Sequence, residues 1–128
     1  MSGKEQMYIK EAFDTNWVVP LGPNVNGFEK DLETFVGEDK RVVVLSAGTA
    51  AVHLALLACG VGAGDEVLVQ SFTFCASSHP ITYLGATPVF VDSEPYTWNM
   101  DPELLEEAIK DRIRKAGKKP KAIIPVAL

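Results

Sequence analysis

The sequence changes from a strand pattern to a helix pattern within Arg41-Val42-Val43-Val44-Leu45-Ser46-Ala47-Gly48-Thr49-Ala50-Ala51. Valine-rich runs favour strands, so residues 41–45 are predicted to form one. Because the run is continuously apolar, we expect this strand to be buried on both faces of a parallel sheet. A helix is predicted from Gly48 to about Cys59. Because apolar residues occupy nearly all of its faces, we expect this helix to be deeply buried.

The turn between these two elements has the features of an anion site. The first N–H groups of a helix have no partners within the helix, and they lie at the positive end of its dipole. Gly48 has no Cβ to keep an anion from the backbone, and Thr49 adds a hydroxyl donor. An ordinary strand-to-helix turn with nothing bound explains the same residues, and this stretch alone leaves both interpretations open.

Composition excludes several classes of protein. The chain has 128 residues, enough for one domain, with 47% hydrophobic and 23% charged residues. A net charge of −5 argues against a nucleic-acid partner. There is no charged-then-apolar leader, and no apolar run approaches the ~20 residues that span a bilayer. We therefore expect a cytoplasmic protein with no membrane partner.

Cysteine and histidine give no sign of a metal site. Cys59 and Cys75 lie in apolar helical patterns and are predicted to be core thiols. Together with His53 and His79 they show no metal-ligand spacing, so no metal is expected. A lone histidine on a buried helix, such as His53, is more typical of structure than of catalysis.

The chain outside the opening stretch begins with an arm and continues as alternating helices and strands. Residues 1–25 are expected to form an arm with a stiff segment over 16–23, and Trp17 in it is predicted to dock on this chain or a partner. A helix is predicted over 26–36, with Asn26 and Glu29 as a capping box. The later elements are strand 66–70, a helix ending near 84, strand 88–92, a helix capped by Asp101 with Pro102 first, and strand 121–126.

This alternation predicts an α/β fold, a mostly parallel sheet covered by helices, in one domain over 26–128. Ligands bind such sheets at the carboxyl ends of the strands, here 46–50, 71–77 and 92–94. Phe74 lies at one of these ends and can stack on a flat ring, although a core position is its more common role. Asp92 alone is typical of a turn. The glycines of 60–65 do not form a dinucleotide site, because they follow a helix and precede a strand.

Several motifs follow one another in a familiar order. They are Pro20-Leu21-Gly22-Pro23-x-Val25-x-x-Phe28-Glu29, Ser46-Ala47-Gly48-Thr49-Ala50-Ala51-Val52-His53-Leu54-Ala55-Leu56, Gly62-x-Gly64-Asp65-Glu66-Val67, Ser71-Phe72-Thr73-Phe74, Gly85-Ala86-Thr87-Pro88-Val89-Phe90-Val91-Asp92 and Lys121-Ala122-Ile123-Ile124-Pro125-Val126. As an ordered set over nearly the whole chain from about residue 16, they resemble the DegT/DnrJ/StrS family of pyridoxal-phosphate-dependent aminotransferases, which act mostly on keto-sugar nucleotides.

The resemblance implies the aspartate-aminotransferase type of fold (fold type I), with this chain as the N-terminal half of its three-layer large domain. It implies pyridoxal 5'-phosphate as cofactor, with Gly48, Thr49 and Ala50 binding its phosphate and Phe74 stacking on its pyridine ring. It implies a keto-sugar nucleotide and an amino-acid donor, glutamate, as substrates in polysaccharide biosynthesis. It also implies a homodimer, with the arm over 17–23 near the active site and the interface.

The catalytic residues that the resemblance implies are not in this chain. In the family the Schiff-base lysine and the carboxylate that pairs with the ring nitrogen lie beyond the position of Leu128, so residues 1–128 alone are predicted to be inactive. Ala127 stands where the family has a histidine, which puts that histidine's contact in doubt. Two alternatives stay open: a sugar dehydratase of the same family, in which histidine replaces the lysine, and a truncated module with no enzymatic activity.

Overall fold

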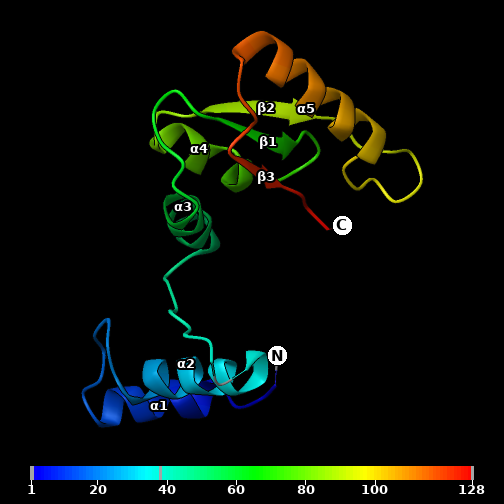
Figure 1. Ribbon diagram of the computed structural model, residues 1–128. Coiled ribbons are helices and arrows are strands. Elements are labelled where there is room, and N and C mark those ends of the chain that lie inside the picture. The colour runs from blue at the N-terminus through cyan, green and yellow to red at the C-terminus, as the bar shows by residue number, and fades with distance from the viewer. Residues whose placement is uncertain (1, 38, 128) are drawn as a thin grey trace. The chain divides into compact units, whose positions relative to one another are not determined.

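The computed structural model describes residues 2–37 and 39–127 (Figure 1). The chain divides into two compact units at Val44 and Leu45, and each is described by itself. The sequence analysis instead divided the chain after residue 25, into an arm over 1–25 and a domain over 26–128. That division stays a prediction. Glu38 and Leu128, which belong to that predicted domain, lie outside the described residues.

The first unit contains helices α1 (Glu5–Asp14) and α2 (Pro23–Val36). The expected capping box is wrong, because α2 begins at Pro23, where a missing N–H does no harm. Glu29 instead accepts a hydrogen bond from the Val44 N–H at 3.0 Å. Helix α1 was not predicted from the sequence. None of its residues is buried.

The predicted strand over 41–45 is wrong for the described chain. Residues 41–45 have no regular secondary structure, and no described strand pairs with them. Two of their amides donate instead to carboxylates of α2: Val42 N–H to Glu33 at 3.3 Å, and Val44 N–H to Glu29. Valine content favours an extended conformation, but a strand also needs a neighbouring backbone to complete its ladder.

The second unit is an α/β layer structure around a parallel sheet. Its elements in order are α3 (Gly48–Ala58), β1 (Glu66–Gln70), η1 (Cys75–Ser77), α4 (His79–Tyr83), β2 (Thr87–Val91), α5 (Pro102–Ala116) and β3 (Ala122–Ile124). Strand β1 lies at the centre of the order β2-β1-β3 and is parallel to both neighbours. The connection from β1 to β2 through α4 and the connection from β2 to β3 through α5 cross the sheet in opposite directions. Because such connections are right-handed, α4 and α5 lie on opposite faces of the sheet, as Figure 1 shows.

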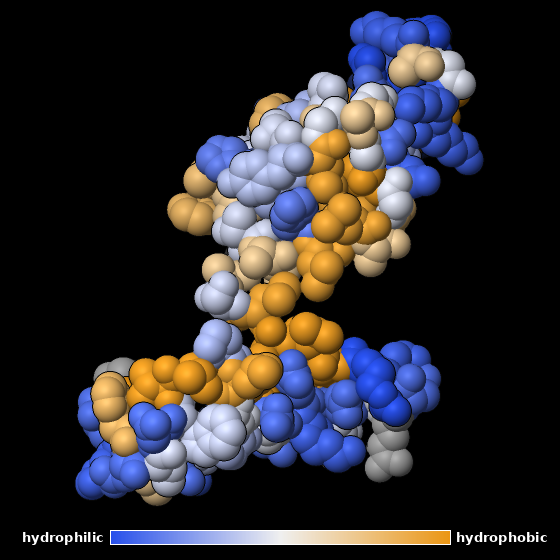
Figure 2. Space-filling view, turned by 90° about the vertical axis from the view of Figure 1, so that its left-hand side faces the viewer, coloured by the Kyte–Doolittle hydropathy of each residue, from blue (hydrophilic) through white to orange (hydrophobic). Residues whose placement is uncertain are grey.

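The core of this unit forms on both faces of β1. Val67 and Val69 pack with Ile81 on one face, and Leu68, which alternates with them, is equally buried on the other. The expected deep burial of α3 is wrong, because Leu56 is its one buried residue. Its other apolar side chains are partly or largely exposed, and Figure 2 shows hydrophobic atoms on the surface of each unit.

The two cysteines are also exposed, contrary to the expectation of core thiols. Cys59 follows the last residue of α3, and Cys75 opens the short helix η1. Both therefore lie at helix ends and not on packed helix faces, a distinction that an apolar sequence pattern does not reveal.

Helix α5 begins as predicted. The Asp101 side chain accepts hydrogen bonds from the N–H groups of Glu103 (2.8 Å) and Leu104 (3.1 Å), and Pro102 follows it. Gly117 ends the helix with a φ of 71°, in the left-handed conformation that glycine adopts without strain. Among the described residues, none of the helices has the length and apolar content needed to cross a membrane.

Candidate functional site

The carboxyl edge of the sheet is the place where the second unit gathers candidate binding residues. Because both strand pairs are parallel, the segments that leave β1, β2 and β3 emerge at the same edge. These segments begin at Ser71, Asp92 and Pro125. Ligands of open α/β sheets bind at this edge, so the topology agrees with the position predicted for a site.

The N-terminus of α3 presents free amide groups. Ala47 precedes the helix with an extended backbone, and no side chain caps the helix. The first amide that bonds back along the chain is that of Ala51, which donates to the Ala47 carbonyl at 3.2 Å. The amides of Gly48, Thr49 and Ala50 precede it and need an outside acceptor, which an anion would supply.

The surroundings of Gly48 leave room for such an anion. A Cβ built at Gly48 would meet no protein atom within 4 Å, so packing does not require a glycine there. The space that a side chain would occupy is open and adjoins the free amides. A phosphate group fits this arrangement in charge, in donors and in room.

Phe74 presents an exposed ring at the turn that leaves β1. The residue is 77% exposed, and it precedes η1 with an extended backbone. The turn is ordered beneath it, because Ser77 N–H donates to the Phe74 carbonyl at 2.9 Å and the Thr73 and Ser77 hydroxyls lie 2.8 Å apart. Exposure removes the core role that its residue type suggested and leaves the ring face available for stacking.

The structure brings the two predicted contributions into one packed unit. Helix α3, which begins at Gly48, packs against η1, which Phe74 precedes. The roles of Gly48, Thr49, Ala50 and Phe74 toward a cofactor stay predictions.

The hydrogen bonds at Asp92 link the ends of two strands. Ser71 donates its hydroxyl proton to Asp92 Oδ1 at 2.9 Å, and the Ser93 N–H donates to the same oxygen at 2.9 Å. These bonds, that from Ser93 first, hold the pKa of Asp92 below its ordinary value. Asp92 is thus an ionised residue that orders the turn, in agreement with its interpretation from the sequence.

Sequence reasoning missed Gln70, the last residue of β1. Its side chain is polar but fully buried, like the three apolar residues that precede it in the same strand. It makes hydrogen bonds to segments that follow both neighbouring strands. A polar residue that ends an apolar parallel strand was the available signal, because burial of an amide requires such partners.

His53, the histidine on α3, makes a packing contact. The His53 ring meets the Tyr83 ring edge to face at 5.7 Å, a packing contact between α3 and α4. Over the residues that the structure describes, no group of three histidine, cysteine, aspartate or glutamate side chains is placed to hold a metal ion.

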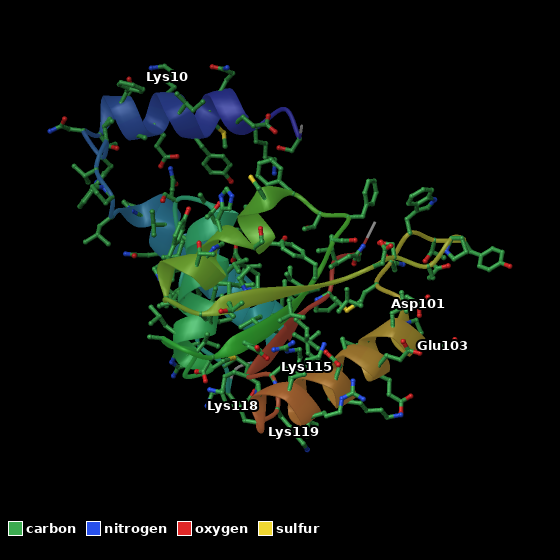
Figure 3. The ribbon with its side chains drawn as sticks, turned by 90° about the horizontal axis from the view of Figure 1, so that it is seen from above. Lys10, Asp101, Glu103, Lys115, Lys118 and Lys119 are labelled. Carbon is green, nitrogen blue, oxygen red and sulfur yellow. The ribbon has the colours of Figure 1, made fainter. Side chains whose placement is uncertain are left out.

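Lysines and ion pairs concentrate at the opposite, amino edge of the sheet. Arg112 donates to both carboxylate oxygens of Glu66, at 2.7 and 2.9 Å, and Lys118 lies 2.9 Å from Asp65. These bonds hold the pKa of each carboxyl below its ordinary value. Figure 3 shows Lys115, Lys118 and Lys119 at the C-terminal end of α5.

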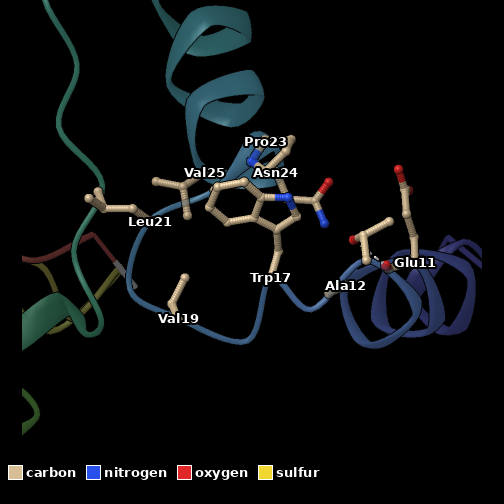
Figure 4. Close-up of a pocket in the computed structure, with 10 residues that line it drawn as sticks. Glu11, Ala12, Trp17, Val19, Leu21, Pro23, Asn24 and Val25 are labelled. Atoms are coloured by element: carbon tan, nitrogen blue, oxygen red, sulfur yellow. Dashed lines mark hydrogen bonds between the residues drawn. The ribbon is translucent and has the colours of Figure 1, made fainter.

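Trp17 in the first unit lies against Gly22, within the segment predicted to dock. A Cβ at Gly22 would lie 3.3 Å from the indole Cε3 atom, so the ring covers this glycine. Residues from the end of α1 to the start of α2 surround the ring and line a small hollow of about 50 Å³ (Figure 4). Trp17 is still 49% exposed, so its own unit covers it only in part.

Comparisons with known proteins agree with this architecture. The sequence profile of the DegT/DnrJ/EryC1/StrS aminotransferase family matches residues 1–128. EpsN of Bacillus subtilis (strain 168), named as a pyridoxal phosphate-dependent aminotransferase, is 54% identical over 128 residues, which are 100% of this chain and 32% of EpsN. GDP-perosamine synthase of Caulobacter vibrioides is 43% identical over 128 residues, again 100% of this chain and 32% of the relative.

A solved structure gives the same result for the fold. The crystal structure of a DegT DnrJ EryC1 StrS aminotransferase from Brucella abortus matches with a TM-score of 0.83 and 38% identity, over 94% of this chain and 32% of that one. The chain thus spans about a third of the length of the relatives it matches, and the predicted α/β fold of fold type I is confirmed. The chain belongs to the DegT/DnrJ/EryC1/StrS aminotransferase family.

Proposed function

We propose that the whole protein is a pyridoxal-phosphate-dependent aminotransferase that moves an amino group from an amino acid, glutamate, to a keto-sugar nucleotide. The observation that carries this proposal is the uncapped N-terminus of α3, with open space at Gly48, in a chain of this family. The name of the relative GDP-perosamine synthase supports a nucleotide-linked sugar as substrate.

The residues of this chain would hold the cofactor and leave its chemistry to residues elsewhere. The amides of Gly48, Thr49 and Ala50 and the Thr49 hydroxyl would bind the phosphate, aided by the helix dipole. The exposed Phe74 ring would stack on the pyridine ring and fix its plane. When bound, pyridoxal phosphate supplies an electron sink for the substrate carbon that carries the amino group.

We propose that the reacting lysine lies outside residues 1–128. A lysine that attacks a carbonyl must be neutral, which burial or a neighbouring cation brings about. Lys110, Lys115 and Lys118 each form an exposed ion pair, with Glu106, Asp111 and Asp65 respectively. None of these three side chains is buried, and Lys118 in particular is bound to Asp65 at the amino edge of the sheet.

We also propose that the protein acts as a homodimer and that the segment over 17–23 lies near the dimer interface. The exposed part of the Trp17 ring supports this, because a large apolar side chain on a stiff segment is suited to a partner surface.

A half-reaction on the whole protein tests the proposal. The protein is purified, loaded with pyridoxal phosphate and mixed with L-glutamate, and the absorbance of the cofactor is followed together with the formation of 2-oxoglutarate. We expect glutamate to convert the cofactor to its amino form, and a keto-sugar nucleotide to reverse the change with gain of an amino group. Failure to bind the cofactor would contradict the proposal, and loss of a sugar hydroxyl without amination would identify a dehydratase instead.

A matched pair of variants connects the activity to the site. Thr49→Val keeps the shape of the side chain and removes the hydroxyl donor, so we expect weaker cofactor binding. Thr82→Val makes the same change on α4, where the hydroxyl donates to the His79 carbonyl at 2.7 Å. That control should bind the cofactor as the parent does, and equal weakening in both variants would count against a phosphate at Thr49.

A further inference from the structure

Gln70 is the one fully buried polar side chain among the described residues, and its surroundings are specific. It ends β1 after Val67, Leu68 and Val69, all with no exposed surface. Burying an amide is unfavourable unless its donors and acceptor are paired, and each polar atom of Gln70 has a partner. An apolar residue would fill this position at no such cost, so the carboxamide must be explained by what it holds.

The carboxamide joins the segments that leave all three strands. Its Nε2 donates to the Trp98 carbonyl at 2.8 Å and to Ser93 Oγ at 3.2 Å, both in the segment between β2 and α5. Its Oε1 accepts from the Val126 N–H, just after β3, at 3.2 Å. This orientation of the amide follows from its partners, because a carbonyl needs a donor and an N–H needs an acceptor.

Trp98, which Gln70 binds, also contacts the turn that carries Phe74. Trp98 has a φ of 64°, a left-handed conformation that bulky residues rarely adopt, so contacts around it must maintain it. Its indole ring lies 5.4 Å from the Phe72 ring, centre to centre. Phe72 is two residues before Phe74, and Ser71 between Gln70 and Phe72 is bonded to Asp92.

We propose that Gln70 is a positioning residue for the cofactor site: its carboxamide fixes the turn that carries Phe74 against the segments that follow β2 and β3. This inference rests on the proposed function, because it assigns Gln70 a role in cofactor binding. Gln70 itself is buried and does not touch the cofactor. It acts through Trp98 and Val126, whose backbones it holds at the carboxyl edge.

The test compares Gln70→Met with Val67→Ala in the whole protein. Methionine matches the length of glutamine and removes every hydrogen bond of the carboxamide. Val67→Ala creates a packing defect in the same strand, at its amino end, away from the site. Pyridoxal phosphate affinity is measured by equilibrium dialysis, the asymmetry of the bound cofactor by visible circular dichroism, and unfolding by denaturant.

We expect Gln70→Met to weaken cofactor binding about 10- to 100-fold, as small displacements of binding groups do, and to change the circular dichroism of the bound cofactor. Amide exchange at Val126 should become faster. Val67→Ala should lower stability and leave both cofactor readouts at the parent values. Equal effects of the two variants on affinity, at similar stability, would overturn the proposal, as would a Gln70→Met variant with the parent's affinity and spectrum.

Two further results keep the inference separate from the proposed function. If the parent protein does not bind pyridoxal phosphate, the proposed function fails. If the parent binds and Gln70→Met does not differ from it, only the role of Gln70 fails. Should Gln70→Met not fold, Gln70→Asn replaces it, because an amide shortened by one methylene cannot reach Trp98 and Val126 together, and the same expected and contrary results apply.

Discussion

Gly48→Ala separates the stability of the chain from its ability to bind an anion. A Cβ at this position meets no protein atom within 4 Å, and Gly48 is not among the glycines with positive φ. Alanine is therefore accommodated without strain, and we expect the free energy of unfolding to stay equal or rise by up to about 1 kcal/mol, the gain found when alanine replaces a compatible glycine.

The same methyl group occupies the open space beside the free amides. A phosphate would then lose close approach to about one donor, and a hydrogen bond to a charged group is worth about 1.5–3 kcal/mol. Since about 1.4 kcal/mol corresponds to a tenfold change in affinity, we expect the Kd for pyridoxal phosphate to rise about 10- to 150-fold.

The assay is cofactor titration of the whole protein followed by fluorescence, alongside denaturant unfolding. Gly62→Ala is the matched control, since a Cβ at Gly62 also meets no atom within 4 Å and its φ is not positive. Gly62 lies before β1, at the amino edge of the sheet. Unchanged affinity in Gly48→Ala, or equal weakening in Gly62→Ala, would refute the placement of the phosphate.

Further predictions concern the framework of the second unit. The Glu66 pKa lies below its ordinary value, 4.5, because Arg112 donates hydrogen bonds to it, so its contribution to stability is present above that value and is lost as the pH falls through the lowered pKa. Unfolding measured against pH should show Glu66→Gln losing this acid dependence, and an unchanged profile would contradict the pairing. Asp101→Ala should destabilise α5 by about 1 kcal/mol, seen as faster amide exchange at Glu103, whereas Asp101→Asn should retain the cap. Equal amide exchange at Glu103 in the two variants would argue against the Asp101 cap. Ile81→Ala should cost about 2–5 kcal/mol in denaturant unfolding, because the side chain is fully buried, and a cost below that of an exposed position would contradict the core.

Local signals predicted the elements whose structure depends on neighbours in sequence. Strand β1 spans Glu66–Gln70 as expected, and the Asp101 cap and the helix that starts at Gly48 agree with the sequence analysis. The Asp101 cap and the alternation of strands and helices depend on residues close together in sequence, so one sequence is sufficient to show them. The capping box expected at Asn26 and Glu29 did not form, because α2 begins three residues earlier, at Pro23.

Features that depend on distant partners could not be predicted in this way. Residues 41–45 have the composition of a strand, but pairing decides whether a strand forms, and α2 supplies carboxylates to that segment instead of a backbone. The role of Gln70 depends on Trp98 and Val126, 28 and 56 residues further along the chain, which no local pattern connects.

We propose that this chain binds the cofactor phosphate while the reacting lysine lies elsewhere. A crystal structure of the whole protein with pyridoxal phosphate tests it most directly. We expect the phosphate within hydrogen-bond distance of the amides of Gly48, Thr49 and Ala50, the Phe74 ring against the pyridine ring, and the lysine linked to the cofactor outside residues 1–128. A phosphate bound away from α3, or a linkage to any lysine of residues 1–128, would contradict the claim.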